Sequence, residues 1–205
     1  MLNFFLTILW CAVGYVIGSI PWGLVIGKTF FHKDIREYGS HNLGGTNAGR
    51  VLGKPIGVLV IVLDACKALL VMILCHAFTP SAVPFAGLFV SVGHCFPVFA
   101  QFRGGKGVAC GFGYLLGLSL YGFGDLFFSF IYPVLIFFLV LGLSRMVSLS
   151  SMCAMVAATI LSFIFLKERY VAVLVLILTL LVIFRHIRNI QRIIQKKESK
   201  VSYIK

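Results

Sequence analysis

The run FFLTILWCAVGYVIGSIPWGLVI, from Phe4 to Ile26, indicates the fold class of this chain. It is uncharged and long enough to cross a bilayer as a helix. A basic segment before it and a small-residue cleavage site after it are both missing, so we expect a spanning helix rather than a removable signal peptide. The whole chain of 205 residues has the same character, with 60% hydrophobic and 12% charged residues. Since charged residues make up about a quarter of a soluble domain, this composition indicates a polytopic membrane protein.

Seven apolar segments follow one another along the chain, each near the length that a transmembrane helix needs. They lie at about 4–26, 55–76, 82–101, 108–122, 126–143, 146–166 and 170–185. The fourth is the weakest, because it is short and rich in glycine. We predict an all-α membrane protein with seven transmembrane helices in one integral-membrane domain, residues 1–205. Pro21 and Pro97 should kink two of these helices.

The basic residues are distributed unevenly over the connecting loops. Of the 18 Lys and Arg, 15 fall on one predicted side, two on the other, and Lys67 lies within a span. Cytoplasmic loops carry the excess of Lys and Arg, so the N-terminus should lie outside and the C-terminus in the cytoplasm. The basic tail is best explained by attraction to anionic lipid headgroups, through Lys196, Lys197, Lys200 and Lys205.

The segment GSHNLGGTNAGR, from Gly39 to Arg50, is the main polar interruption. Glycines let backbone N–H groups turn toward a ligand, Ser, Thr and Asn add neutral donors, and Arg50 supplies a fixed charge. This composition suits an anion, although an ordinary solvated loop has a similar one. Three more polar turns fall on the same predicted side, at 102–107, 144–151 and 186–192. Four such turns, poor in carboxylates, predict an anion site at the cytoplasmic face.

Several polar residues allow two interpretations. Asp64 and Lys67 lie in one predicted span, and we favour an ion pair within the helix over a direct role. His94 either takes part in acid–base chemistry or contacts a buried partner, and we slightly favour the partner. Lys106 lies between glycines but lacks the nucleotide P-loop pattern, so ATP binding is not inferred. The six cysteines show no metal-ligand spacing and should pack as small hydrophobic residues.

In order and spacing, the motifs resemble those of the acyl-phosphate-dependent glycerol-3-phosphate acyltransferases, the PlsY family. They are Gly18-Ser19-Ile20-Pro21, Asp34-Ile35-Arg36 with the Gly39–Arg50 segment, Gly93-His94-x-Phe96-Pro97 running into Gly104-Gly105-Lys106-Gly107, and His186-x-x-Asn189-Ile190-x-Arg192. The chain departs from the family pattern at a few positions: His41 replaces a usual Gly, and Ala68, Cys110 and Lys197 also differ.

The resemblance implies a multi-pass enzyme of phospholipid synthesis in the bacterial cytoplasmic (inner) membrane. It would move a fatty acyl group from acyl phosphate to the 1-hydroxyl of sn-glycerol 3-phosphate, giving lysophosphatidic acid and phosphate. Acyl phosphate is already activated, so the protein need supply mainly positioning and charge stabilisation. A substrate phosphate could take the hydroxyl proton, with His94 or His186 as lesser candidates.

The residues expected at this site fall into two classes. The catalytic class is Ser40, Arg50, Lys106, His186 and Asn189. The substrate- or phosphate-binding class is Gly39, Asn42, Gly44, Thr46, Asn47, His94, Gly104, Gly105, Arg145, Ser148, Ser150 and Arg192. We expect no cofactor, no metal ion and no nucleic acid, and a monomer surrounded by membrane lipids.

Other classes of protein fit the sequence less well. No His is followed five residues later by Asp, so the H-x-x-x-x-D motif of thioester-using glycerolipid acyltransferases is absent. A transporter should place its cationic groups near the bilayer midplane, where only Asp64 and Lys67 carry charge. A lipid-binding scaffold would need the basic tail but not four polar turns.

Overall fold

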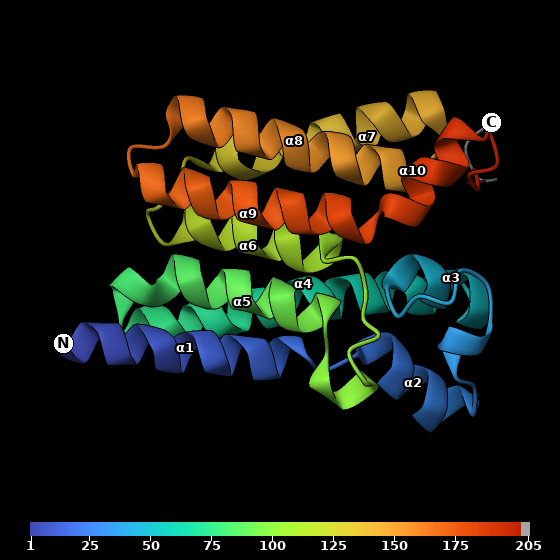
Figure 1. The fold of residues 1–205 in the computed structure, drawn as a ribbon, viewed down its shortest axis with the longest axis horizontal. Helices are drawn as coiled ribbons and strands as arrows, with labels where there is room; N and C mark the ends of the chain where they lie inside the picture. The colour runs from blue at the N-terminus through green and yellow to red at the C-terminus, as the bar shows by residue number, and fades with distance from the viewer. Residues whose placement is uncertain (202–205) are drawn as a thin grey trace. The chain divides into compact units, whose positions relative to one another are not determined.

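The computed structural model describes residues 1–201, and this part of the chain is helical without a β-strand (Figure 1). The chain divides into two compact units, Met1–Gly117 and Leu118–Lys205. Each unit is described by itself below. The predicted all-α class is confirmed.

The first unit contains α1 (Leu2–Gly18), α2 (Trp22–Phe31), α3 (Gly45–Leu52), α4 (Lys54–Phe78), α5 (Val83–Cys95) and the start of α6 (Val108–Leu120). Short 3-10 turns add η1 (Ile35–Glu37), η2 (Pro80–Ala82) and η3 (Val98–Ala100). The predicted break at Pro21 is present, whereas Pro97 follows the end of α5 and does not kink a continuous helix. The first apolar run breaks between Gly18 and Trp22, just before and at Pro21, and α5 ends two residues before Pro97.

Glycines allow α1 and α5 to run side by side in the first unit (Figure 1). A Cβ added at Gly18 would lie 2.8 Å from the backbone Cα of Val90, and one added at Gly93 would lie 2.9 Å from the backbone nitrogen of Ser19. Small residues at such crossings let two membrane helices pack backbone to backbone. The Tyr15 hydroxyl also donates to the Phe96 carbonyl at 2.8 Å. The end of α1 is therefore fixed beside the end of α5.

The second unit contains the π-helical turn η4 (Phe127–Ile131), α7 (Tyr132–Ser144), α8 (Val147–Phe165), α9 (Arg169–Arg185) and α10 (Ile187–Ile194). Thr159 of α8 donates to Thr179 of α9 at 2.8 Å inside the apolar packing. The last apolar segment does not continue as one straight helix, because α9 and α10 meet at a bend of 58°. His186 thus lies at this bend, and Asn189 and Arg192 follow it on α10.

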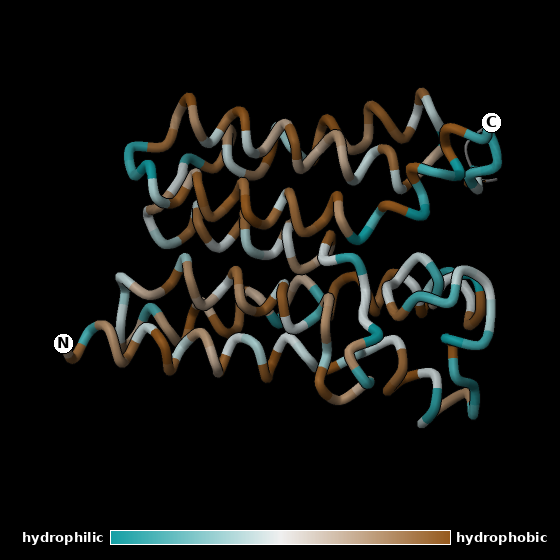
Figure 2. Tube along the Cα trace, viewed as in Figure 1, coloured by the Kyte–Doolittle hydropathy of each residue, from teal (hydrophilic) through white to brown (hydrophobic). Residues whose placement is uncertain are grey.

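Helix length and hydropathy agree with a membrane protein. Five helical segments are long and apolar enough to cross a bilayer, or six if α9 and α10 form one span, and α6 is apolar but shorter. Figure 2 shows hydrophobic residues along the helices and hydrophilic residues gathered between α2 and α3, before α6 and around α10. Three cysteines, Cys75, Cys95 and Cys110, are buried as expected, whereas Cys66 is exposed on α4.

The packing of α1 against α5 predicts opposite effects for two glycine substitutions. Gly18→Ala should destabilise the protein by about 1–3 kcal/mol or more, because its Cβ has no room beside Val90. Gly142→Ala on α7 is the matched control, because nothing lies within 4 Å of its added Cβ. It should be neutral or stabilising by about 0.4–1 kcal/mol. Thermal unfolding in detergent measures both, and equal shifts would contradict the helix crossing.

Candidate active site

Asn47, in the first turn of α3, organises the predicted anion loop. Its side-chain amide donates to the carbonyls of Ile35 at 2.8 Å, Asn42 at 2.9 Å and Tyr38 at 3.2 Å. Its Oδ1 accepts from the backbone N–H of Ser40 at 2.8 Å. The residue is only 1% exposed, and its contacts join the loop to Ile35 and Tyr38 just before it. Asn47 therefore shapes the loop from within.

The left-handed backbone of the loop explains its glycine and its unusual histidine. Gly39 has φ of 63°, and a side chain there would collide with the Asn47 amide. His41 has φ of 55°, a conformation that costs a non-glycine residue about 1–2 kcal/mol. Its Nδ1 lies 2.8 Å from the carbonyl oxygen of Arg36, which offsets part of that cost. The glycine that is usual in the family at this position adopts a left-handed backbone without strain, whereas His41 adopts it at a cost in free energy.

The start of the loop is fixed by an ion pair. Asp34 accepts from the Arg36 guanidinium at 2.7 Å and lies 3.3 Å from the Lys28 ammonium. The hydrogen bond from Arg36 holds the pKa of the Asp34 carboxyl well below its ordinary value, against the opposing effect of burial. Asp34 is therefore an ionised anchor of the loop.

Asn42 links the loop to the turn that carries Lys106. Its Oδ1 accepts from the Gly44 N–H at 2.9 Å, and its Nδ2 donates to the Gly104 carbonyl at 3.4 Å. Thr46 and Arg50, four residues apart, are exposed on one face of α3, and Ser40 is half-buried. The first unit thus brings two predicted groups together, the Gly39–Arg50 loop and the Gly104–Lys106 turn.

The Lys106 turn is anchored to the end of α5. The Gly105 N–H donates to the His94 carbonyl at 3.0 Å, and both Gly104 and Gly105 are buried. Lys106 is half-buried and stands directly before the glycine that precedes α6. The N–H of Gly105 is thus used within the protein, in fixing the shape of the turn.

A buried ionic cluster lies beneath this turn. Lys67 Nζ is 2.9 Å from Asp64 Oδ1 and 3.0 Å from His94 Nδ1, and His94 Nδ1 is 3.3 Å from Asp64 Oδ1. The predicted ion pair within α4 is confirmed, and His94 of α5 joins it. Lys67 also donates to the carbonyls of Gly18 at 2.9 Å and Ile20 at 3.1 Å. Removing one partner of such a buried pair typically costs about 3–5 kcal/mol.

The same cluster contains the set of side chains most like a metal site among the described residues. Asp64, His94 and Cys110 present donor atoms within 4.8 Å of one another, and all three are buried. The ammonium of Lys67 already lies against two of these donors, at 2.9 and 3.0 Å. In this arrangement the donors bind a cation that belongs to the chain itself.

Glu198 organises the predicted site residues of the second unit. Its carboxylate accepts from Ser148 Oγ at 2.7 Å, Asn189 Nδ2 at 2.6 Å and Arg192 Nε at 2.8 Å. Burial alone would raise the pKa of the Glu198 carboxyl, but these hydrogen bonds outweigh it and hold the pKa below its ordinary value. Glu198 was not among the predicted site residues, although a lone carboxylate within a strongly basic tail was a usable signal.

The remaining predicted residues of this unit have local partners. His186 is buried at the bend, where its Nδ1 lies 2.8 Å from the Val182 carbonyl oxygen. Ser150 donates to the Met146 carbonyl at 2.8 Å within its own helix. Arg145 ends α7 with φ of 59°, and its carbonyl accepts from the Val201 N–H at 2.8 Å. The structure therefore joins Ser148, Asn189 and Arg192 through Glu198, while Ser150 is held by its own helix.

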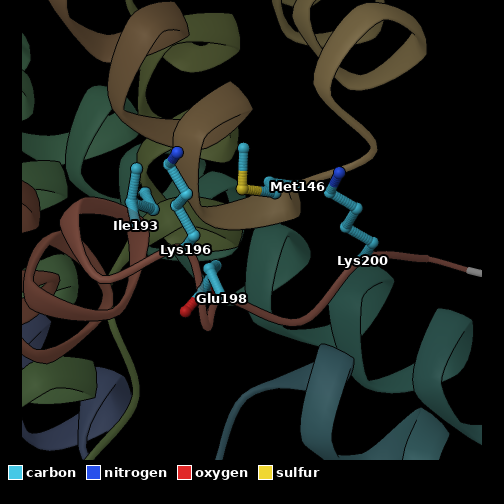
Figure 3. Close-up of a pocket in the computed structure, with 5 residues that line it drawn as sticks. All are labelled: Met146, Ile193, Lys196, Glu198 and Lys200. Atoms are coloured by element: carbon cyan, nitrogen blue, oxygen red, sulfur yellow. The ribbon is translucent and has the colours of Figure 1, made fainter.

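A pocket of about 230 Å³ opens beside Glu198 (Figure 3). Its other lining residues are Met146, Ile193, Lys196 and Lys200. Two of the lysines that we assigned to lipid headgroups therefore flank a hollow. Lys205, assigned to the same role, lies outside the described residues.

Comparison with known proteins gives consistent results. A family model described as glycerol-3-phosphate acyltransferase matches residues 8–196. Glycerol-3-phosphate acyltransferase of Geobacillus kaustophilus (strain HTA426) is 44% identical over 199 residues, which cover 97% of this chain and 98% of the relative. The enzyme of the same name from Bacillus subtilis (strain 168) is 44% identical over 193 residues, covering 94% and 96%.

Two solved structures share the fold. Crystal structures of PlsY (YgiH), an integral membrane glycerol 3-phosphate acyltransferase, match in a glycerol 3-phosphate form with a TM-score of 0.85 and in a lysophosphatidic acid form with a TM-score of 0.83. Both are 31% identical to this chain, cover 96% of it, and are themselves covered over 96% and 95% of their length. The chain therefore belongs to the glycerol-3-phosphate acyltransferase (PlsY) family.

Proposed function

We propose that this acyltransferase moves a fatty acyl group from acyl phosphate to the 1-hydroxyl of sn-glycerol 3-phosphate, releasing lysophosphatidic acid and inorganic phosphate. The two related PlsY structures were solved in a glycerol 3-phosphate form and a lysophosphatidic acid form, which supports this substrate and this product. The observation that carries the proposal is the link from Asn42 to Gly104, because it joins the loop of Arg50 to the turn of Lys106. Two cationic segments that are rich in hydrogen-bond donors then bind the same anion.

The chemistry needs little more than such a surface. The substrate hydroxyl oxygen attacks the acyl carbon, the bond from that carbon to the phosphate oxygen breaks, and phosphate leaves with the electron pair. Lys106 and Arg50 stabilise the negative charge on the departing phosphate. The hydroxyl proton passes to a substrate phosphate, since His94 Nδ1 faces Asp64 and Lys67 and His186 Nδ1 faces a backbone carbonyl.

The loop residues divide between contact and positioning. Ser40 and Thr46 provide donors to the phosphate, and Gly44, whose N–H donates to Asn42, contributes through the shape of the loop. Asn42 and Asn47, whose amides are used inside the first unit, position those donors.

The second unit orients glycerol 3-phosphate. His186 and Asn189 contact it, Arg192 and Ser148 assist, and Glu198 fixes the last three of these side chains. Arg145 supplies a further charge. Ser150, held by the Met146 carbonyl, has a supporting role.

We further propose that the chain crosses the bacterial inner membrane seven times, as one membrane domain and as a monomer. The shorter α6 counts as a span, the N-terminus lies outside, and the polar turns and basic tail face the cytoplasm. The distribution of Lys and Arg supports this orientation. The reaction as written uses no cofactor, metal ion or nucleic acid.

The purified protein in detergent should release phosphate from a long-chain acyl phosphate only when glycerol 3-phosphate is present, and lysophosphatidic acid should form in equal amount. Phosphate assay and mass spectrometry measure the two products. A transporter or a lipid-binding scaffold would give neither product. Acyl transfer from a thioester but not from acyl phosphate would contradict the proposed donor.

Replacing either phosphate-binding cation should abolish most turnover. Lys106→Ala and Arg50→Ala should each lower kcat by about 10²–10³-fold, because the departing phosphate loses charge stabilisation. Lys33→Ala is the control, since Lys33 is an exposed lysine close to the loop but outside the proposed site. Near-normal rates in folded Lys106→Ala or Arg50→Ala protein would rule out the assigned roles.

Cysteine labelling in intact cells tests the orientation. In a cysteine-free variant, a membrane-impermeant maleimide should label Ser81→Cys from outside, since Ser81 is exposed in the loop before α5. Ser199→Cys, exposed in the basic tail, should react only after the membrane is permeabilised. Labelling of both from outside, or of Ser199→Cys alone, would refute the seven-span arrangement.

A further inference from the structure

We propose that Lys67 and Asp64 are positioning residues for acyl transfer, which act by holding the His94 ring against the turn that carries Lys106. The proposal rests on the phosphate-binding role proposed for Lys106. It assigns a function to a buried cluster that touches no substrate in the mechanism above.

The ammonium group of Lys67 is enclosed by a cage of polar partners. Its ammonium contacts the carbonyls of Gly18 and Ile20, the Asp64 carboxylate and the His94 ring, all at 2.9–3.1 Å. The Lys67 and Asp64 side chains are 3% and 2% exposed. One cation thus ties the break after α1 to α4 and α5.

The His94 ring connects this cage to the turn that carries Lys106. Nδ1 of the ring is held by Lys67 and Asp64, at 3.0 and 3.3 Å. The other side of the ring lies directly against Gly105, where an added Cβ would be 2.7 Å from Cε1 and 2.8 Å from Cδ2. The Gly105 N–H also donates to the His94 carbonyl at 3.0 Å. A rotation of the ring would therefore displace the backbone directly before Lys106.

The charges in this cluster need a reason beyond packing. Ions buried at membrane depth are costly, and apolar side chains of similar size would often be as stable. A charged cage, however, fixes one ring orientation, because the lysine must point at its carbonyl and carboxylate partners at once. The fixed orientation of the His94 ring in turn holds the Lys106 turn in place.

A double-mutant cycle tests the contact between ring and turn. Gly105→Ala should lower kcat/KM severely, because its Cβ overlaps the His94 ring. In a His94→Asn background, where the shorter side chain leaves room, the loss caused by Gly105→Ala should be about 10-fold or more smaller. Fully additive losses would overturn the proposal.

A second measurement tests whether Lys67 acts on turnover or only on folding. Lys67→Met and Asp64→Asn should lower kcat of the folded protein by about 10-fold or more while KM for glycerol 3-phosphate changes little. Thr159→Val is the matched control, because it removes a buried hydrogen bond from the second unit. It should lower the unfolding temperature without changing kcat.

The outcomes separate this inference from the proposed function. If wild-type protein does not use acyl phosphate, or Lys106→Ala keeps its rate, the proposed function fails. If both behave as expected but Lys67→Met and Asp64→Asn lower only the unfolding temperature, as Thr159→Val does, the positioning role fails. Should Lys67→Met not fold, Asp64→Asn and the Gly105–His94 cycle decide the question alone.

Discussion

The first unit depends on one constraint, that backbone groups at membrane depth must be hydrogen-bonded. Leaving a carbonyl unsatisfied in an apolar medium costs several kcal/mol. The break after α1 creates this problem, because Pro21 has no N–H and the helix does not continue. Lys67 solves it by donating to Gly18 and Ile20, and the cost of burying its charge is offset by Asp64. The broken helix and the ionic cluster are thus one structural feature.

A polar region in each unit repeats this design with a different hub. Asn47 holds the anion loop through backbone carbonyls, and Glu198 gathers donors that are 50 and 9 positions away in the sequence. A buried hub holds the backbone in place while the side chains around it point outward. This explains why Arg50 and Thr46 are exposed while Asn47, between them on α3, is not.

Local sequence features predicted the helices well, because apolar length, proline and i,i+3 spacing act within one segment. They gave the proline break after α1 and the Asp64–Lys67 pair. They did not predict that His94 contacts this pair, and they did not predict the role of Glu198. Both depend on contacts between segments that are distant in the sequence. In the sequence, His41 stood out only as a departure from the family pattern. Its φ of 55° explains why the family usually has glycine at this position. The bend at His186 could not be predicted from the sequence, because no proline or glycine lies next to it.

The placement of the carboxylates bears on where the hydroxyl proton goes. Asp34, Asp64 and Glu198 are each bound to a basic side chain of the protein. For Asp34 and Glu198, hydrogen bonds hold the pKa of the carboxyl below its ordinary value, so each stays ionised and engaged at neutral pH. Such groups are poor proton acceptors for a substrate hydroxyl. A phosphate group, whose second pKa is about 6, is better matched to that task, which favours proton transfer to the substrate itself.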